Sequence, residues 1–160
     1  MNIEIILADF SNEQQCADIV SLLNDYALDP MGGGKGLSSF AKENLITELS
    51  KLPYAISVIC YLDKKPAGLV NCFQGFSTFK CKPLLNIHDV IVLSEYRGFG
   101  LCQRLLTKVE EIAKEKGCCK LTLEVLEGNN KAQKAYIEYG FEAYELDPAS
   151  GKALFWQKSL

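Results

Sequence analysis

The sequence predicts an α/β (α+β) fold, a mixed and mostly antiparallel sheet of about seven strands flanked by four helices. Segments with strand-like alternation and segments with helical spacing follow one another along the whole chain. The length of 160 residues suits one hydrophobic core, and 48% hydrophobic with 23% charged residues is an ordinary globular composition. No repeat or linker interrupts the pattern, so we expect residues 1–160 to form a single domain.

The first half of the chain predicts two helices and three strands. In chain order these are a strand over 2–8, a helix from Ser11 to about Pro30, a helix from Ser38 or Ser39 to before Pro53, and strands over 54–62 and 67–76. Ser11 and Gln14 have the spacing of a capping box at the start of the first helix. Residues 63–66 (DKKP) form the turn of a predicted hairpin, and residues 31–36 (MGGGKG) are expected to form a flexible loop.

The second half predicts two more helices and four more strands. In chain order we expect an irregular segment over 77–86, a strand over 87–93, a helix over 99–117, a strand over 119–126, a helix from about 129 to Gly140, and strands over 141–146 and 153–158. Residues at helical spacing between 99 and 117 share one apolar face: Leu101, Leu105, Val109, Ile112 and Ala113. Gly117 marks the end of that helix.

Composition argues against several classes of function. The net charge of −3 and the pI near 5.3 disfavour nucleic acid as a partner, because phosphate binding needs a basic face. No apolar run is long enough for a membrane span, and the N-terminus lacks the basic region of a secretory signal. Seven cysteines without a CxxC pair, together with a single histidine, predict no metal site. The cysteines indicate a reducing compartment, so we expect a cytoplasmic protein.

A strand, a glycine-containing turn and a long helix follow one another between residues 90 and 117. A helix N-terminus presents unpaired amides and the positive end of a dipole, and glycine lets an anion approach the backbone. The turn therefore predicts a pyrophosphate-binding site. Lys35-Gly36 does not satisfy the P-loop pattern, and Gly98-x-Gly100 is followed by Gln103 where a dinucleotide fingerprint has its third glycine.

Two motifs resemble the signatures of the GNAT superfamily of N-acetyltransferases. Arg97-x-x-Gly100-x-Cys102 is similar to the acyl-CoA signature Q/R-x-x-G-x-G/A, and the segment from Asn129 through Tyr136 to Gly140-Phe141 resembles a second signature at matching spacing. The resemblance covers residues 87–145 and implies acetyl-CoA as co-substrate. Cys102 departs from the usual glycine or alanine, so we expect a slightly tighter turn rather than loss of binding.

The resemblance assigns the contacts to acetyl-CoA. Val90, Ile91 and Val92 would hydrogen-bond the pantetheine arm as an added strand does, and a backbone amide there would polarise the thioester carbonyl. The residues implied to contact the pyrophosphate are Arg97, Gly98, Phe99, Gly100, Leu101, Cys102 and Gln103. Asn129 would contact the pantetheine arm, cap its helix, or do both.

Tyr136 is the predicted general acid. The leaving CoA thiolate must be protonated, and a phenol with a pKa of about 10 can donate to a thiolate whose acid has a pKa near 8.5. The alternative is a half-buried core tyrosine on an amphipathic helix.

Three further residues are candidates for handling the amine. His88 is a candidate general base, because an ammonium must lose a proton before it attacks, although a lone histidine also suits a structural role. Asp89 would contact a cationic amine, and the segment from Asn86 to Gly100 also resembles polyamine acetyltransferases. Glu124, expected on the neighbouring strand, could act through a water or be a structural acid.

Together these observations predict an N-acetyltransferase that transfers acetyl from acetyl-CoA to a primary amine of a small molecule or peptide. A non-catalytic acyl-CoA-binding regulatory module and a protein acetyltransferase remain as alternatives. The segment 31–36 lies where the family has its variable acceptor loop, and it equally suits a plain helix connection. A homodimer is left open, since the last two predicted strands could offer a sheet edge to a second copy.

Overall fold

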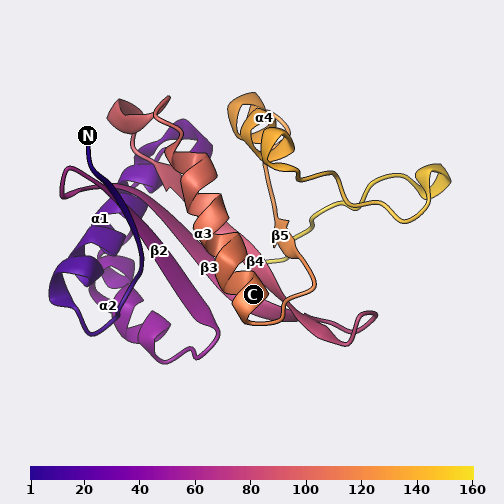
Figure 1. Cartoon of the computed structure of the whole chain (residues 1–160), viewed down its shortest axis with the longest axis horizontal. Coiled ribbons are helices and arrows are strands. Elements are labelled where there is room, and N and C mark those ends of the chain that lie inside the picture. Colours follow the sequence, from indigo (N-terminus) through magenta and orange to yellow (C-terminus); the bar gives the residue numbers. More distant parts are fainter. The chain divides into compact units, whose positions relative to one another are not determined.

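The computed structural model describes all residues, 1–160, as an α/β fold with four α-helices and one five-stranded sheet (Figure 1). The chain divides into two compact units, Met1–Leu123 and Glu124–Leu160. The α/β class and the four helices are confirmed, but the prediction of about seven strands is wrong. No helix is both long and apolar enough to span a bilayer.

The sheet lies wholly in the first unit and has the order β1-β2-β3-β4-β5. Its strands are β1 (Ile3–Leu7), β2 (Ala55–Leu62), β3 (Lys65–Ser77), β4 (Lys82–Val92) and β5 (Leu121–Leu123). The first four pair antiparallel, and β5 pairs parallel to β4. The sheet is therefore mixed and mostly antiparallel, as the sequence predicts.

Two hairpins set the register of the central strands. The turn between β2 and β3 consists of only Asp63 and Lys64, both at positive φ (47° and 67°), which matches the right-handed twist of the strands. The irregular segment predicted over 77–86 is wrong, because β3 continues to Ser77 and β4 begins at Lys82. In the sequence, Lys80, Lys82 and Pro83 interrupt the apolar pattern of these two strands. The strand ends next to the turn are largely exposed, so they need no apolar pattern.

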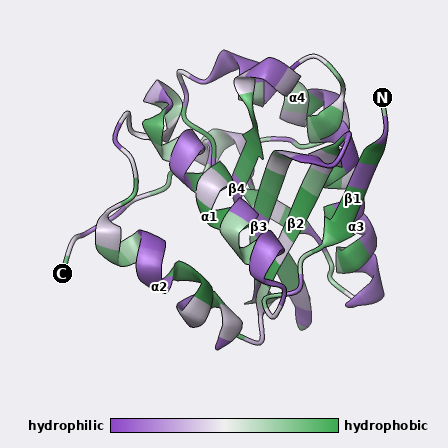
Figure 2. Cartoon of the chain, turned by 90° about the vertical axis from the view of Figure 1, so that its left-hand side faces the viewer, coloured by the Kyte–Doolittle hydropathy of each residue, from purple (hydrophilic) through white to green (hydrophobic).

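Helices of the first unit cover both faces of the sheet. The four helices of the chain are α1 (Glu13–Leu28), α2 (Ser39–Ser50), α3 (Leu101–Glu115) and α4 (Asn130–Tyr139). Ile19 and Leu22 of α1 pack against Ile59, Leu69 and Ile91, and Figure 2 shows α1 in front of the hydrophobic strands. On the opposite face α3 contacts β2, β3 and β4.

The close packing of α3 against the sheet leaves room only for glycine at position 68 of β3. A Cβ on Gly68 would come within 3.0 Å of the Leu105 side chain and 2.8 Å of the Ile91 carbonyl oxygen. The five apolar positions that predict the inner face of α3 are all buried. Gly117, at φ 71°, follows the helix in the left-handed conformation, as expected of a C-terminal glycine.

The N-terminal cap of α1 differs from the prediction. The Asn12 side chain accepts the Gln15 amide at 3.1 Å and caps α1, whereas the predicted Ser11–Gln14 capping box does not form. Gln14 instead donates to the Asp18 carboxylate at 3.0 Å. Ser38 caps α2, which begins at Ser39 and so agrees with the predicted start near Ser38 or Ser39.

The predicted strands over 141–146 and 153–158 are wrong. In the second unit only an isolated bridge joins Glu145 to Lys152, next to a hydrogen bond from the Ala153 amide to the Tyr144 carbonyl. An apolar alternating pattern forms a strand only where a neighbour completes its hydrogen bonds. The predicted strand over 119–126 is likewise reduced to β5. The homodimer prediction therefore loses the sheet edge on which it rested.

Candidate active site

Strand β4 has one open edge at its C-terminal end. Its residues pair with β3 as far as Val92, but β5 pairs only with Leu85, Asn86 and Ile87. From His88 to Val92 no strand occupies the other side. This stretch contains Val90, Ile91 and Val92, the residues predicted to bind the pantetheine arm.

Backbone direction determines which of these groups face the open edge. The Leu93 amide donates to the Ala67 carbonyl at 3.0 Å, and the Ile91 carbonyl points at Gly68, so both face β3. Backbone groups alternate along a strand, so the amides and carbonyls of Val90 and Val92 face away from β3. A pantetheine amide chain could pair with them as an additional strand does.

His88 and Asp89 lie in the middle of β4, not at its start as predicted. Asn71 aligns with Asp89 while Cys72 aligns with Ile87, so His88 is the extra residue of a β-bulge. The His88 Nδ1 is 3.3 Å from the Asp89 Oδ1. The His88 ring also meets the Phe73 ring edge-to-face, with 5.6 Å between centroids. The bulge therefore brings the candidate base and the candidate acceptor contact together.

The glycine turn leads from β4 directly into α3. Gly98 (φ 88°) and Gly100 (φ 72°) both adopt the left-handed conformation, and a Cβ on either would meet no atom within 4 Å. Gly100 is the N-cap residue of α3 and provides no side-chain hydrogen bond, so no cap side chain occupies the first amides of the helix. This geometry fits a bound pyrophosphate, and Phe99 is exposed beside it.

Cys102 is compatible with an anion at this position. Burial raises the pKa of its thiol, so the side chain stays neutral at physiological pH and does not repel a phosphate. The departure from glycine or alanine therefore adds volume but no charge.

Arg97 is held by two contacts on the protein side. Its Nε donates to the Val92 carbonyl at 3.1 Å, and its terminal nitrogen pairs with the Asp29 carboxylate at 3.1 Å. The other carboxylate oxygen of Asp29 accepts the Met31 amide at 2.9 Å. This hydrogen bond caps the 3₁₀ turn that follows, Pro30–Gly32. Arg97 thus links the glycine-rich segment 31–36 to the end of β4.

The remaining predicted residues belong to the second unit. Asn129 caps α4 by accepting the Ala132 amide at 3.2 Å, as one of its two predicted roles requires. Tyr136 is half-buried near the end of α4, and its ring contacts Phe141. Glu124 follows β5 rather than lying on a strand. The catalytic and binding roles of these residues stay predictions.

Two buried polar residues on β2 and β3 were not predicted from the sequence. Ser57 and Asn71 are buried, and Asn71 donates to Asp89 at 3.0 Å. Each interrupts an otherwise apolar strand (AISVICYL and AGLVNCF), which is the signal that could have identified them.

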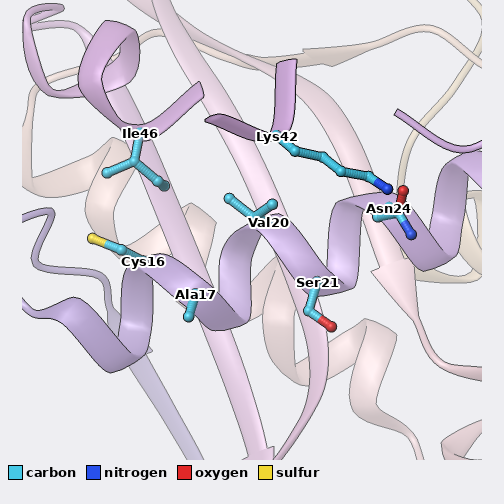
Figure 3. A pocket seen from close by; sticks show the side chains of 7 residues that line it. All are labelled: Cys16, Ala17, Val20, Ser21, Asn24, Lys42 and Ile46. Carbon is cyan, nitrogen blue, oxygen red and sulfur yellow. The ribbon is translucent and has the colours of Figure 1, made fainter. Parts of the chain in front are cut away.

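A separate groove of about 490 Å³ lies between α1 and α2 (Figure 3). None of the predicted site residues lines it. Its lining consists of Cys16, Ala17, Val20, Ser21, Asn24, Lys42 and Ile46.

Comparison with known proteins identifies similar chains. Residues 17–141 match the model of the acetyltransferase (GNAT) family. A thialysine N-epsilon-acetyltransferase of Bos taurus is 38% identical over 79 residues, which cover 49% of this chain and 45% of the relative. The chain thus spans less than half the length of this relative.

Two further proteins resemble larger parts of the chain. A putative ribosomal protein bS18 alanine N-acetyltransferase of Bacillus subtilis is 29% identical over 105 residues, which cover 66% of each chain. A crystal structure of an aminoglycoside acetyltransferase from an uncultured soil sample, in complex with sisomicin, superimposes with a TM-score of 0.80 at 16% identity, covering 99% of this chain and 96% of that chain.

Proposed function

Because this chain belongs to the acetyltransferase (GNAT) family, we propose that it is an acetyl-CoA-dependent N-acetyltransferase acting on a primary amine. The observation that carries the proposal is the open edge of β4, which runs through two left-handed glycines into the uncapped N-terminus of α3. An extended amide arm ending in a pyrophosphate suits this combination of strand edge and helix terminus.

Binding of acetyl-CoA would use backbone groups more than side chains. Val90 and Val92 would pair with the pantetheine arm, and the amides from Gly98 to Gln103 would hold the pyrophosphate. Acetyl-CoA supplies the acetyl group as a thioester. The Arg97 side chain, already engaged with Val92 and Asp29, would act by fixing the turn and by its positive charge.

Two residues of the chain would each transfer one proton. The amine nitrogen forms a bond to the acetyl carbon, the C–S bond breaks, and its electron pair leaves on the CoA sulfur. His88 would take the proton that the amine must lose, and Tyr136 would donate a proton to the sulfur. Asp89 would attract the cationic acceptor to the bulge in β4. Glu124 would at most assist through a water.

The acceptor class follows from what the relatives have in common. The names of three similar proteins give thialysine, an alanine of ribosomal protein bS18 and an aminoglycoside as acceptors, and acetylation at nitrogen needs an amine on each. We extend this class, and no single acceptor, to the present chain. All seven cysteines are free, which supports a reducing compartment such as the cytoplasm.

The test is a CoA-release assay with acetyl-CoA against polyamines, diamines, amino acids, aminoglycosides and short peptides, combined with calorimetry of acetyl-CoA binding. Thiol release with one class of amine would establish the enzyme and its acceptor. Binding without release across the panel would favour the regulatory module or a protein acceptor. Failure to bind acetyl-CoA would refute the proposal.

A further inference from the structure

Three polar side chains lie side by side across the middle of the sheet. Ser57 on β2 aligns with Asn71 on β3, and Asn71 aligns with Asp89 on β4. The equivalent line two residues further along is entirely apolar, because Ile59 aligns with Leu69 and Leu69 with Ile91. Both lines face α1, since the apolar one packs against that helix. The polar line thus occupies positions at which apolar core residues would be expected.

The hydrogen bonds along this line have one direction. Ser57 Oγ donates to Asn71 Oδ1 at 2.7 Å, and Asn71 Nδ2 donates to Asp89 Oδ2 at 3.0 Å. A flipped Asn71 amide would point its oxygen at the carboxylate, so the Asp89 carboxylate fixes its orientation and the Ser57 hydroxyl turns to donate to Asn71 Oδ1. The line therefore ends in a carboxylate that accepts a hydrogen bond from a buried side-chain amide.

Burial decreases along the line toward Asp89. The exposed fraction is 2% for Ser57 and 4% for Asn71, and rises to 16% for the Asp89 side chain. A buried amide and hydroxyl add little stability compared with apolar residues of the same size. Their contribution is to orient the one member that reaches the surface, beside His88 in the bulge.

The surroundings of Asp89 are negative. Burial, and then the charges of Asp89 and Asp29, raise the pKa of the Tyr26 phenol on α1. Arg97 neutralises Asp29 at 3.1 Å, whereas Asp89 has no lysine or arginine partner and contacts His88 and the uncharged Asn71 amide. The unbalanced charge at the end of α1 is therefore that of Asp89, and its complement is a cation.

We propose that Asn71 and Ser57 are positioning residues that hold Asp89 in place to bind an ammonium group of the acceptor. The inference rests on the proposed N-acetyltransferase function. The nitrogen that attacks must be neutral, so the ammonium group that remains paired with Asp89 is a second one, and the preferred acceptors carry two amino groups. Ser57 and Asn71 touch neither substrate and act only through Asp89.

The kinetic test uses Asn71→Leu and Ser57→Ala. We expect Asn71→Leu to raise the KM for a diamine acceptor about tenfold, the value of one hydrogen bond to a charged group, and Ser57→Ala to raise it less. The KM for acetyl-CoA should stay within about twofold, since the backbone of β4 is not altered. In an Asp89→Asn background, Asn71→Leu should have no further effect, because the two residues act as one unit.

Tyr61→Phe is the matched control. It removes a different hydrogen bond to a buried carboxylate, from Tyr61 on β2 to Asp18 on α1 at 2.7 Å. We expect it to lower stability while leaving the KM for the amine unchanged. Equal effects of Tyr61→Phe and Asn71→Leu on that KM, or full additivity of Asn71→Leu with Asp89→Asn, would overturn the inference.

A binding measurement separates this inference from the proposed function. 1,5-Diaminopentane is titrated into the wild-type protein and into the folded variants, with calorimetry or NMR shifts as readout. Wild-type binding that weakens about tenfold in Asn71→Leu supports the positioning role even if no turnover is found. Equal affinity of the two proteins, or no binding to either, would refute it.

Discussion

Tyr136 combines a structural and a proposed chemical role in one residue. Its carbonyl accepts the amides of Gly140 and Phe141, which closes the end of α4, and its ring packs against Phe141. A phenylalanine at this position would keep both of these features. Removing the hydroxyl alone therefore tests the proposed chemical role while these two features stay in place.

We predict that Tyr136→Phe lowers kcat about a hundredfold, because general acid catalysis by a positioned side chain contributes at least that much. Acetyl-CoA affinity and the melting temperature should stay close to wild type. The measurement is steady-state CoA release with calorimetry as the control. An unchanged kcat would mean that the thiolate obtains its proton elsewhere.

Individual site residues could be predicted only where local sequence determines them. Asn129 precedes a helix with the spacing of a cap, and it caps α4. Ser57 and Asn71 could not be matched with Asp89 in the same way, since their alignment depends on a two-residue turn and on the bulge at His88. Such long-range register is not encoded in any one segment.

At the scale of the element, α3 offers two glycines in the same conformation. Gly100 precedes the helix at φ 72° and Gly117 follows it at φ 71°, and a Cβ on either meets nothing within 4 Å. Replacement by alanine therefore costs backbone strain only, about 1 kcal/mol at each site. One glycine lies in the proposed pyrophosphate site and the other at the opposite end of the helix.

We predict that Gly100→Ala and Gly117→Ala lower the unfolding free energy by similar amounts, while only Gly100→Ala weakens acetyl-CoA binding, by about tenfold. Chemical denaturation and calorimetry on both variants test this. Equal affinity of the two variants for acetyl-CoA would remove the N-terminus of α3 from the binding site.

Elements were predicted best where one face of a single segment is buried. The apolar positions of α3 recur at helical spacing, and all of them lie in the core. The strands predicted over 141–146 and 153–158 failed because Leu154, Phe155 and Trp156 carry an apolar pattern but remain exposed. Hydrophobic pattern alone does not supply the partner that a strand needs.

At the scale of the whole molecule, the residues predicted to act on acetyl-CoA are divided between the two compact units. The β4 edge and the start of α3 belong to Met1–Leu123, while Asn129 and Tyr136 belong to Glu124–Leu160. We propose that residues 1–160 nevertheless act as one domain, because the reaction needs the thioester and its proton donor together.

Hydrogen exchange with and without acetyl-CoA tests this proposal. At a ligand concentration about a hundred times Kd, we predict slower exchange both at Val90 and Val92 and along α4, up to about a hundredfold. The amides of β1 make no proposed contact with acetyl-CoA, so their exchange should slow only where it requires unfolding of the whole molecule. Protection confined to the first unit would place Asn129 and Tyr136 outside the site.

The free cysteines determine how the protein behaves toward thiol reagents. Burial raises the pKa of Cys60 to about 11 and that of Cys72 to about 12, so their thiolates are almost absent at neutral pH. Cys81, at the tip of the β3–β4 hairpin, is exposed, whereas the other four cysteines outside the sheet interior are only partly so. Alkylation should therefore label Cys81 first and leave the sheet interior unmodified. A dye that counts the CoA released would then see a small, early background from the protein, which pre-treatment with the dye subtracts.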